Sequence, residues 1–522
     1  VQSLLAGQKY PLMQEISKAL KSVSSSLLQR FIDSAYNFSK LPVLNEIFDA
    51  TEVFVTNQFD KKELATLLQG NFGPVNEIGV AVLLKQLVGE VPEDFPEGVY
   101  IRNGPNPLNP TQTSANSILG STSYTHYEGQ GMLHATYFNK SSGGEWTISY
   151  LNKYVHSDTF ELERQKSKGN FIPAAYGKPY AILAAFVLNM VSTIQNLTLL
   201  YIVEGPYNIN GAWNQPFTSH PKKLLHKVDL KFEESRFIHD IGVTTRYNIV
   251  MDNPLRFGIS RILLQKQIFD HDMNGKARIG IMPRFGNADS VRWFDVENHC
   301  SYHLINCFED GNEVVIRGCR TLGSVIPGAP HNADKSEWYR RVFLAPDKNS
   351  EDFDPSLDGI LFSRPYEWRL NLESGTTKEG YLTSEEVAMD FPVINENFIG
   401  VRNKYGYTQV VDSVATSKTG LFKYKMIAKM NFDVRDKENK SLISVEYHAL
   451  QENQFCSGVQ FVAKKNGNDE DDGWIITYVH DEGTNISQVY IIDAKRFSEE
   501  PTAKITLPQR VPYGFHGNFF YK

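Results

Sequence analysis

From about residue 95 onward, short apolar segments alternate with turn residues along the chain. The segments are rich in Val, Ile, Tyr, Phe and Thr, and Gly, Asn, Asp and Pro separate them, which is typical of β-strands. Because this spacing continues over about 400 residues with few helical patterns, it predicts a closed all-β architecture, and a β-propeller fits the length better than a sandwich. No sequence repeat is strong enough to count blades. The clearest predicted strands are 146–150, 199–203, 247–251, 314–317, 474–479 and 489–493.

Residues 10–40 carry a different pattern, in which apolar residues recur mostly three or four positions apart. This period predicts an amphipathic helix. A helix ahead of the main fold either packs on the rest of its own protein or lies on a membrane surface. We therefore expect a helical N-terminal extension over residues 1–70, with membrane contact as one of its two roles, and a separate β-rich domain over residues 71–522.

The longest apolar run is PYAILAAFVLNMV at residues 179–191. Its thirteen residues fall short of the roughly 20 that a membrane-spanning helix needs. We expect an apolar helical insertion around residues 173–195, either as a buried core helix or as a segment that dips into one leaflet.

Composition narrows the class of protein. The aromatic content of 12% fits a β-rich chain. The formal net charge of -7 argues against a nucleic-acid partner, because no net basic field exists to neutralise phosphates. The four cysteines form no CxxC pair and are too few for a disulfide scaffold, which favours a reducing compartment.

Four histidines share one local pattern, since each adjoins an apolar or aromatic stretch typical of a strand. They are His220, His239, His303 and His516, and their separations of 19, 64 and 213 residues match no local zinc-finger spacing. They can meet only through the fold, and spacing alone also fits four unrelated histidines among the 13 in the chain. If they meet, an all-imidazole site suits Fe, Zn or Cu rather than Mg or Ca.

Three carboxylates are candidates for a supporting role beside such a metal. A metal-bound histidine needs an acceptor for its second ring nitrogen, which fixes the tautomer. Glu204, Asp390 and Glu470 each stand at or beside a predicted strand. For any one of them, an ordinary surface residue is the alternative.

A series of ordered motifs covers residues 71–522 and resembles the carotenoid cleavage oxygenases. The motifs are NFGPVNE at 71, GVYIRNGPNP at 98, YEGQGMLH at 127, SHPK at 219, FIHDIGVT at 237, MDNPL at 251, DFPVIN at 390, EDDGW at 470 and VPYGFHGNFF at 511. So many matches in the same order make chance coincidence implausible.

The resemblance implies a seven-bladed β-propeller with a helical cap and iron(II) on its axis. In that family four histidines hold the metal, matching His220, His239, His303 and His516, and three further carboxylates match Glu204, Asp390 and Glu470. The family adds both atoms of O₂ across one double bond and releases two carbonyl products.

Several positions depart from the common family pattern. Asp390 stands where Glu is usual, so the bond to its histidine must be made by a shorter arm. The usual FDGDGM is YEGQGM at 127–132, and the stretch after His220 is rearranged. Met190 follows Asn189 where many relatives carry a small β-branched residue near the iron.

Within the plant part of the family, YEGQGMLHATYF most resembles the zaxinone synthase branch. That resemblance implies cleavage of a hydroxylated apo-10′-carotenal at C13–C14 to a C18 ketone. It also implies a plastid location, with the cytoplasm as the alternative, and contact with a membrane surface that supplies the substrate.

Other functions stay open from the sequence. The enzyme could cleave a C40 carotenoid or a 9-cis-epoxycarotenoid instead of an apocarotenoid. A catalytically silent propeller that binds an apocarotenoid or a protein partner would hold no iron, and a retinoid-type isomerohydrolase would consume no O₂. The complete histidine set disfavours the silent propeller.

Overall fold

The computed structural model describes most of the chain after residue 69. The described residues are 70–108, 114–117, 120–123, 128–157, 160–161, 163–164, 176–178, 181–182, 185, 189, 226–230, 232, 236–258, 261, 266–326, 328–330, 333–439 and 442–522. The predicted helices over residues 10–40 and 179–191 and the predicted strand 199–203 therefore lie outside or largely outside these residues.

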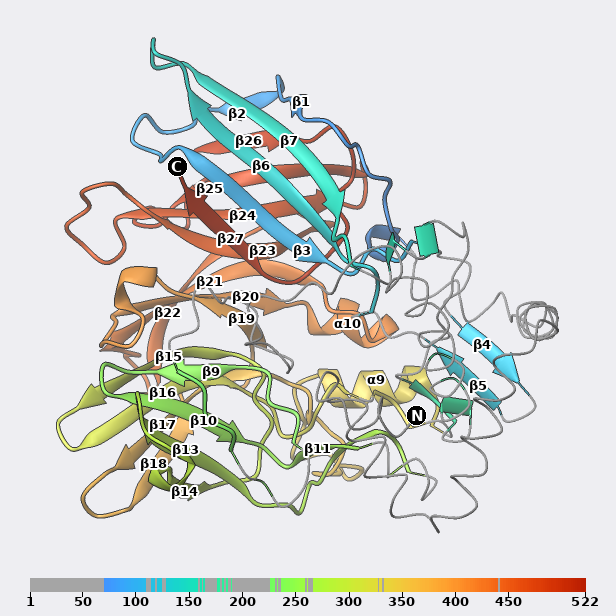
Figure 1. Cartoon of the computed structure of the whole chain (residues 1–522), viewed down its shortest axis with the longest axis vertical. Helices are drawn as coiled ribbons and strands as arrows, with labels where there is room; N and C mark the ends of the chain where they lie inside the picture. Colours follow the sequence, from blue (N-terminus) through green and yellow to red (C-terminus); the bar gives the residue numbers. More distant parts are fainter. Residues whose placement is uncertain are drawn as a thin grey trace, which may run out of the picture.

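Most of the described chain is β-structure, arranged in separate antiparallel sheets (Figure 1). The first has the order β1 (Val82–Leu83), β7 (Trp146–Tyr154), β6 (Met132–Lys140), β3 (Gly98–Gly104) and β27 (Gly517–Tyr521). The second has the order β14 (Arg292–Val296), β13 (Ala277–Pro283), β10 (Tyr247–Asp252) and β9 (Ile241–Val243). The third has the order β15 (Leu304–Asp310), β16 (Glu313–Arg320), β17 (Arg364–Asn371) and β18 (Thr377–Tyr381).

The largest sheet joins the C-terminal strands to one early strand. Its order is β19 (Met389–Val393), β20 (Tyr405–Val411), β21 (Tyr424–Arg435), β23 (Gln454–Ala463), β24 (Gly473–Asp481), β25 (Ile486–Asp493), β26 (Ala503–Thr506) and β2 (Leu87–Gly89), with β22 (Ile443–Ala449) paired to β21. Two small sheets pair β11 (Leu255–Phe257) with β12 (Phe269–His271), and β4 (Ser114–Ser117) with β5 (Gly120–Ser123) and β8 (Tyr176–Gly177).

One edge strand from each of the four larger sheets faces the middle of the molecule. These strands are β9, β15, β19 and β27, each at the end of its sheet order. An exposed edge leaves unpaired backbone groups, and covering one edge with another is a way to protect it. The packing of β15 against both β9 and β19 brings the starts of these strands together.

The hydrophobic core lies between and within the sheets. Strands β23 and β24 are buried along almost their whole length, whereas β7 alternates buried and less buried positions. Continuous burial requires apolar residues on both faces of a strand, and alternation requires them on one face. Trp368 of β17 is fully buried and packs with Tyr366, whose ring centre lies 4.8 Å away.

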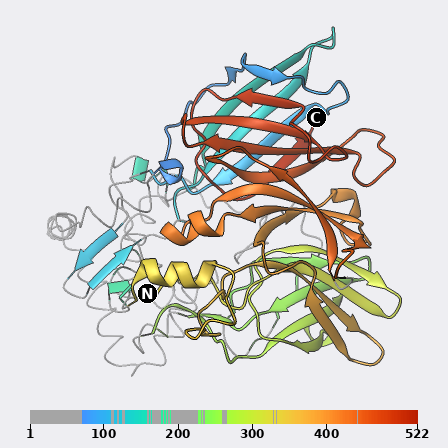
Figure 2. The same cartoon turned by 180° about the vertical axis from the view of Figure 1, so that it is seen from behind.

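Two short α-helices with described bounds, α9 (Lys335–Phe343) and α10 (Ser413–Thr419), lie side by side next to the sheets (Figure 2). The Asp334 carboxylate caps α9 by accepting a hydrogen bond from the Glu337 N–H, and Asp412 caps α10 in the same way. Gly420 ends α10 with a left-handed φ of 74°. Short 3₁₀ turns are η1 (Gly70–Phe72), η3 (Ala288–Ser290) and η4 (Glu396–Phe398).

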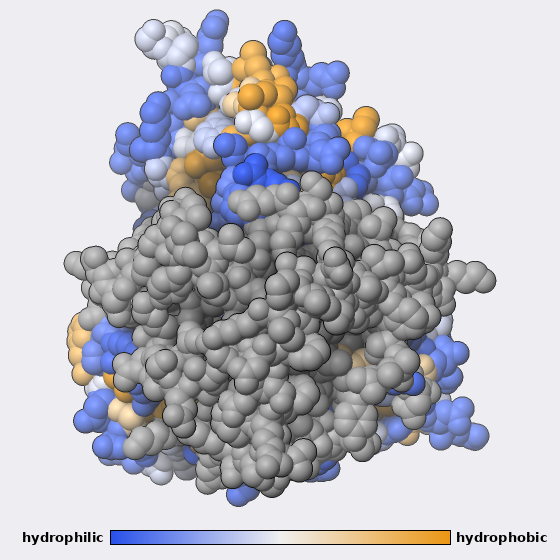
Figure 3. Space-filling model, turned by 45° about the vertical axis from the view of Figure 1, so that its right-hand side comes forward, coloured by the Kyte–Doolittle hydropathy of each residue, from blue (hydrophilic) through white to orange (hydrophobic). Residues whose placement is uncertain are grey.

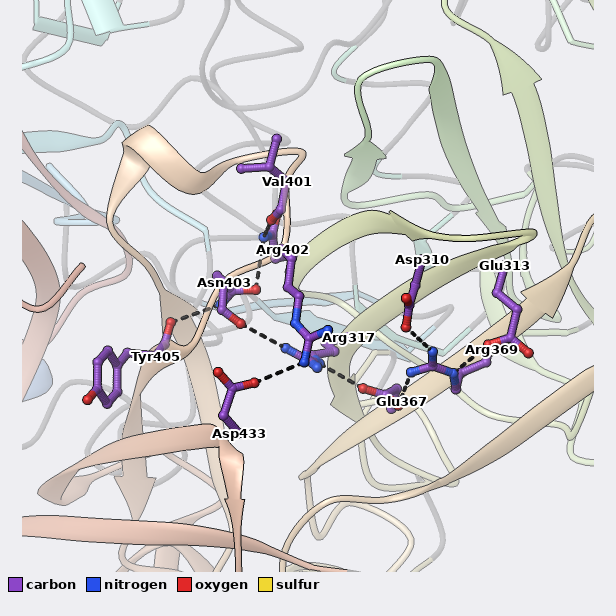
Figure 4. Close-up of polar contacts among 11 residues, drawn as sticks. Asp310, Glu313, Arg317, Glu367, Arg369, Val401, Arg402, Asn403, Tyr405 and Asp433 are labelled. Atoms are coloured by element: carbon purple, nitrogen blue, oxygen red, sulfur yellow. Dashed lines mark hydrogen bonds and ion pairs between the residues drawn. The ribbon is translucent and has the colours of Figure 1, made fainter. Parts of the chain in front are cut away.

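A polar network links the third sheet to the largest sheet (Figure 4). The Arg317 Nε donates to Glu367 at 2.8 Å, and its Nη1 donates to the Asn403 carbonyl at 3.3 Å. The Arg317 guanidinium also lies 4.1 Å from the ring centre of Phe432. Arg369 binds the other oxygen of Glu367, so both oxygens of this partly buried carboxylate are occupied. The ion pair holds the Arg317 guanidinium within the third sheet, and its contacts with the Asn403 carbonyl and the Phe432 ring fasten it to the largest sheet.

An apolar surface patch marks the end of the molecule that carries β1 and β2 (Figure 3). Val80, Leu83, Leu87 and Val88 of that region are exposed. None of the helices in the described part of the chain is both long and apolar enough to cross a membrane.

The predicted strands agree with the structure wherever it is described. Residues 146–150, 247–251, 314–317, 474–479 and 489–493 lie in β7, β10, β16, β24 and β25. The four cysteines are free and buried. The mostly β class is confirmed, and the number of blades stays a prediction.

We expect Arg317→Ala to lower the free energy of unfolding by about 3 kcal/mol, because it removes the buried guanidinium that binds Glu367 and packs on Phe432. The control is Arg402→Ala, since the Arg402–Asp433 pair is 64% and 42% exposed. Exposed pairs contribute about 0–1 kcal/mol. Urea unfolding of both variants measures the difference, and equal losses would show that Arg317 does not fasten the sheets.

Candidate metal centre

Three histidine side chains from distant parts of the chain meet at one point. Ring nitrogens of His239, His303 and His516 all lie within 4.8 Å of one another. The ring centres of His303 lie 5.2 Å from His239 and 5.0 Å from His516, with the ring planes steeply inclined. Ligand atoms this close, on rings at different angles, can share one metal ion.

Each of these histidines stands just before one of the central edge strands. His303 and His516 immediately precede β15 and β27, and His239 lies two residues before β9. Because the starts of these strands lie close together, the histidines just before them lie close together as well.

Local hydrogen bonds hold these strand starts in place. The Asp240 carboxylate accepts from the Leu304 N–H at 2.9 Å and thereby ties the residue after His239 to the residue after His303. The Asn103 side chain accepts from the His516 N–H at 3.1 Å, and the Asn103 N–H donates to the His516 carbonyl at 3.2 Å. Each histidine backbone is therefore fixed by its neighbours.

One carboxylate stands directly behind the group. The His303 Nδ1 lies 2.8 Å from Asp390 Oδ1, on β19. A carboxylate partner sets Nδ1 as the protonated nitrogen, which leaves the Nε2 lone pair for a metal. Asp390 thus orients the ring and makes it a better ligand.

The surroundings of His239 favour its neutral form. Desolvation by the surrounding protein and, second, repulsion from His303 lower the pKa of His239 to about 4. A neutral imidazole at physiological pH is the form that binds metal. An all-imidazole donor set suits Fe, Zn or Cu.

The other predicted site residues have different outcomes. His220, Glu204 and Met190 lie outside the described residues. The Glu470 carboxylate accepts the backbone N–H groups of Lys404 and Tyr405, both at 2.7 Å. These contacts hold the start of β20, and among the described residues no hydrogen bond joins Glu470 to a histidine.

Two neighbours of the group escaped the sequence analysis. Phe391 packs its ring 4.5 Å from His303 and 5.0 Å from His516, centre to centre. Tyr302 packs against His239 at 5.6 Å. Phe391 directly follows Asp390, and Tyr302 directly precedes His303. Their position next to predicted site residues is the sequence feature that could have indicated them.

Comparison with known proteins places this geometry in a family. The family model described as retinal pigment epithelial membrane protein matches residues 72–205 and 206–521. The chain belongs to this family. A curated relative from Pisum sativum, named carotenoid 9,10(9′,10′)-cleavage dioxygenase 1, is 27% identical over 87% of this chain and 89% of its own length. The resemblance to carotenoid cleavage oxygenases is confirmed.

Solved structures of carotenoid cleavage oxygenase relatives share the fold. A lignostilbene dioxygenase from Pseudomonas brassicacearum aligns with a TM-score of 0.67 and 18% identity, covering 88% of this chain and 98% of that one. A variant of the Synechocystis apocarotenoid oxygenase aligns with a TM-score of 0.63 and 16% identity, covering 87% and 98%. At these identities the likeness shows the fold alone.

Substitution of Asp390 and of Glu470 should affect metal affinity differently. We expect Asp390→Asn to weaken binding of a divalent metal about 10–100-fold, because His303 loses the partner that orients it. Glu470→Gln should leave metal affinity unchanged, because its contacts are to backbone. Titration with Co(II), followed by its visible absorption, measures both. Equal weakening in the two variants would contradict the distinction.

Proposed function

We propose that the protein is a non-haem iron(II) dioxygenase that cleaves one C=C bond of an apocarotenoid with O₂, giving two carbonyl products. The observation that carries this proposal is the histidine group with Asp390 behind His303, in a chain of this family. The proposed ligands are His239, His303 and His516. His220 is added as the fourth ligand because the sequence resemblance implies it.

The residues present fit such a metal. Three imidazoles with one oriented by a carboxylate suit iron(II), and no protein carboxylate occupies the described ligand positions. Iron(II), when bound there, supplies the chemistry that activates O₂. The chain's own residues hold the rings, and the aromatic side chains of Phe391 and Tyr302 pack beside them. Regiospecificity then comes from how the polyene is positioned.

The finer architecture belongs to the proposal as well. We place the iron on the axis of a seven-bladed propeller with a helical cap, formed by residues 71–522, with residues 1–70 as an N-terminal extension. The meeting of four edge strands at the histidines supports an axial position. Glu204 and Glu470 were the other expected carboxylate partners, and of these Glu204 stays in the proposal.

The proposed substrate is a hydroxylated apo-10′-carotenal cleaved at C13–C14 to a zaxinone-like C18 ketone. The support is the resemblance of residues 127–138 to the zaxinone synthase branch. Plant relatives named for C40 carotenoids make such substrates the main alternative.

The deciding experiment is anaerobic reconstitution with Fe(II), then incubation in air with the apocarotenal or with C40 carotenoids, with mass spectrometry of the products. A C18 ketone from the apocarotenal alone supports the full proposal. Cleavage of C40 substrates keeps the chemistry and overturns the substrate. Iron-loaded protein without product favours a binding-only propeller, and product without O₂ uptake favours an isomerohydrolase.

We expect His303→Ala to abolish both iron content and turnover, because it removes the ligand that Asp390 orients. The control is His156→Ala, an exposed histidine that pairs with Glu161. Iron is measured by atomic absorption after desalting. Full iron occupancy in His303→Ala would remove His303 from the ligand set.

We also propose a plastid location and contact with a membrane surface. Two plant relatives are named as chloroplastic, and a lipid surface is the natural source of a long polyene. Liposome co-sedimentation with and without residues 1–40 tests the contact. We expect truncation to reduce sedimentation, and identical behaviour of the two proteins would count against the N-terminal helix.

A further inference from the structure

The backbone beside the metal centre contains one unusual residue. Five non-glycine residues in the described chain have a positive φ, and four of them are asparagines. The fifth is Phe391, with a φ of 55°. Asparagine adopts this left-handed conformation readily, but a bulky side chain does so only when its surroundings hold it there.

The left-handed residue forms a bulge in β19. Asp390 pairs with Gln409, but the next pair is Val393 with Tyr407, so one extra residue sits in β19. A bulge bends its strand and redirects the side chains. Pro392 fits there because a bulge needs no donor at that position.

The bulge explains why two adjacent side chains reach the same target. In a regular strand Asp390 and Phe391 would point to opposite faces of the sheet. Here the Asp390 carboxylate bonds to His303, and the Phe391 ring packs on that same histidine and on His516.

The same turn also fixes the carboxylate. Asp390 Oδ1 accepts from the Phe391 N–H at 2.8 Å and lies 2.8 Å from His303 Nδ1. The neighbouring Cys319 thiol has a raised pKa, first because it is buried and second because of the Asp390 charge. The backbone at Phe391 therefore holds the short aspartate arm at the distance that His303 requires.

We propose that Phe391 is a positioning residue for the metal centre, whose left-handed backbone turns both the Asp390 carboxylate and its own ring onto the histidines. The ring keeps His303 and His516 in the orientations in which their nitrogens converge. This inference rests on the proposed function.

The test separates the ring from the backbone strain. Phe391→Gly removes the ring and accepts a positive φ, whereas Phe391→Ala removes the ring and keeps the strain. Phe391→Tyr keeps an aromatic ring and is the conservative variant. Phe432→Leu is the matched control, because Phe432 is a buried ring that packs on Arg317.

The readouts are the Co(II) dissociation constant and the Co(II) visible spectrum, with urea unfolding in parallel. We expect Phe391→Gly and Phe391→Ala to weaken Co(II) binding about 10-fold or more and to alter the spectrum, as other losses of support around metal ligands do. Phe391→Gly should unfold at a higher urea concentration than Phe391→Ala. Phe391→Tyr should keep the Co(II) affinity of the unchanged protein. Phe432→Leu should lower the free energy of unfolding without changing the Co(II) affinity.

The results distinguish failure of the positioning role of Phe391 from failure of the proposed metal centre. Wild-type Co(II) affinity and spectrum in both ring-deleted variants would overturn the positioning role and leave the proposed function intact. A wild-type protein that binds no Co(II) would overturn the metal centre itself, and this inference with it.

Discussion

The convergence of four sheet edges is the constraint on which the rest of this structure depends. Each of β9, β15, β19 and β27 ends its sheet among the described strands, and β15 packs against both β9 and β19. Covering those edges protects backbone groups that would otherwise template association. The same arrangement places the residues at the strand starts within contact distance. A metal centre built there gains rigid support from four sheets at once.

Rigid support matters because the candidate ligands are three separate imidazole rings. Desolvation and, second, repulsion from His303 keep the pKa of His239 low. A single described carboxylate, Asp390, adds negative charge through a hydrogen bond to His303. The ion pair of Arg317 with Glu367 lies elsewhere, between two strands of the third sheet (Figure 4).

Asp390 has a shorter side chain than the glutamate that the sequence resemblance predicts at this position. A shorter side chain reaches less far, yet the distance from Asp390 to His303 is a normal 2.8 Å. The bulge at Phe391 turns the strand next to the carboxylate and also supplies a backbone donor that holds it. The short side chain of Asp390 is therefore held in place by a strained conformation one residue away.

The sequence by itself determined the mostly β class of the fold and selected the histidines that meet at the candidate metal centre. Strand periodicity located β7, β10, β16, β24 and β25, because alternation and turn residues act over a few neighbours. The order of the family motifs selected His239, His303 and His516 as candidate ligands. Their spacing alone did not distinguish them from unrelated histidines.

Only the tertiary structure decided which of the candidates meet. It brought Asp390 to His303 and left Glu470 with the backbone of Lys404 and Tyr405, although both carboxylates stand beside strands. It also revealed Asp240 and Phe391 as neighbours of the site. The physical reason is that strand pairing and bulges connect residues far apart in the chain, and one extra residue in a strand reverses which side chains face the centre.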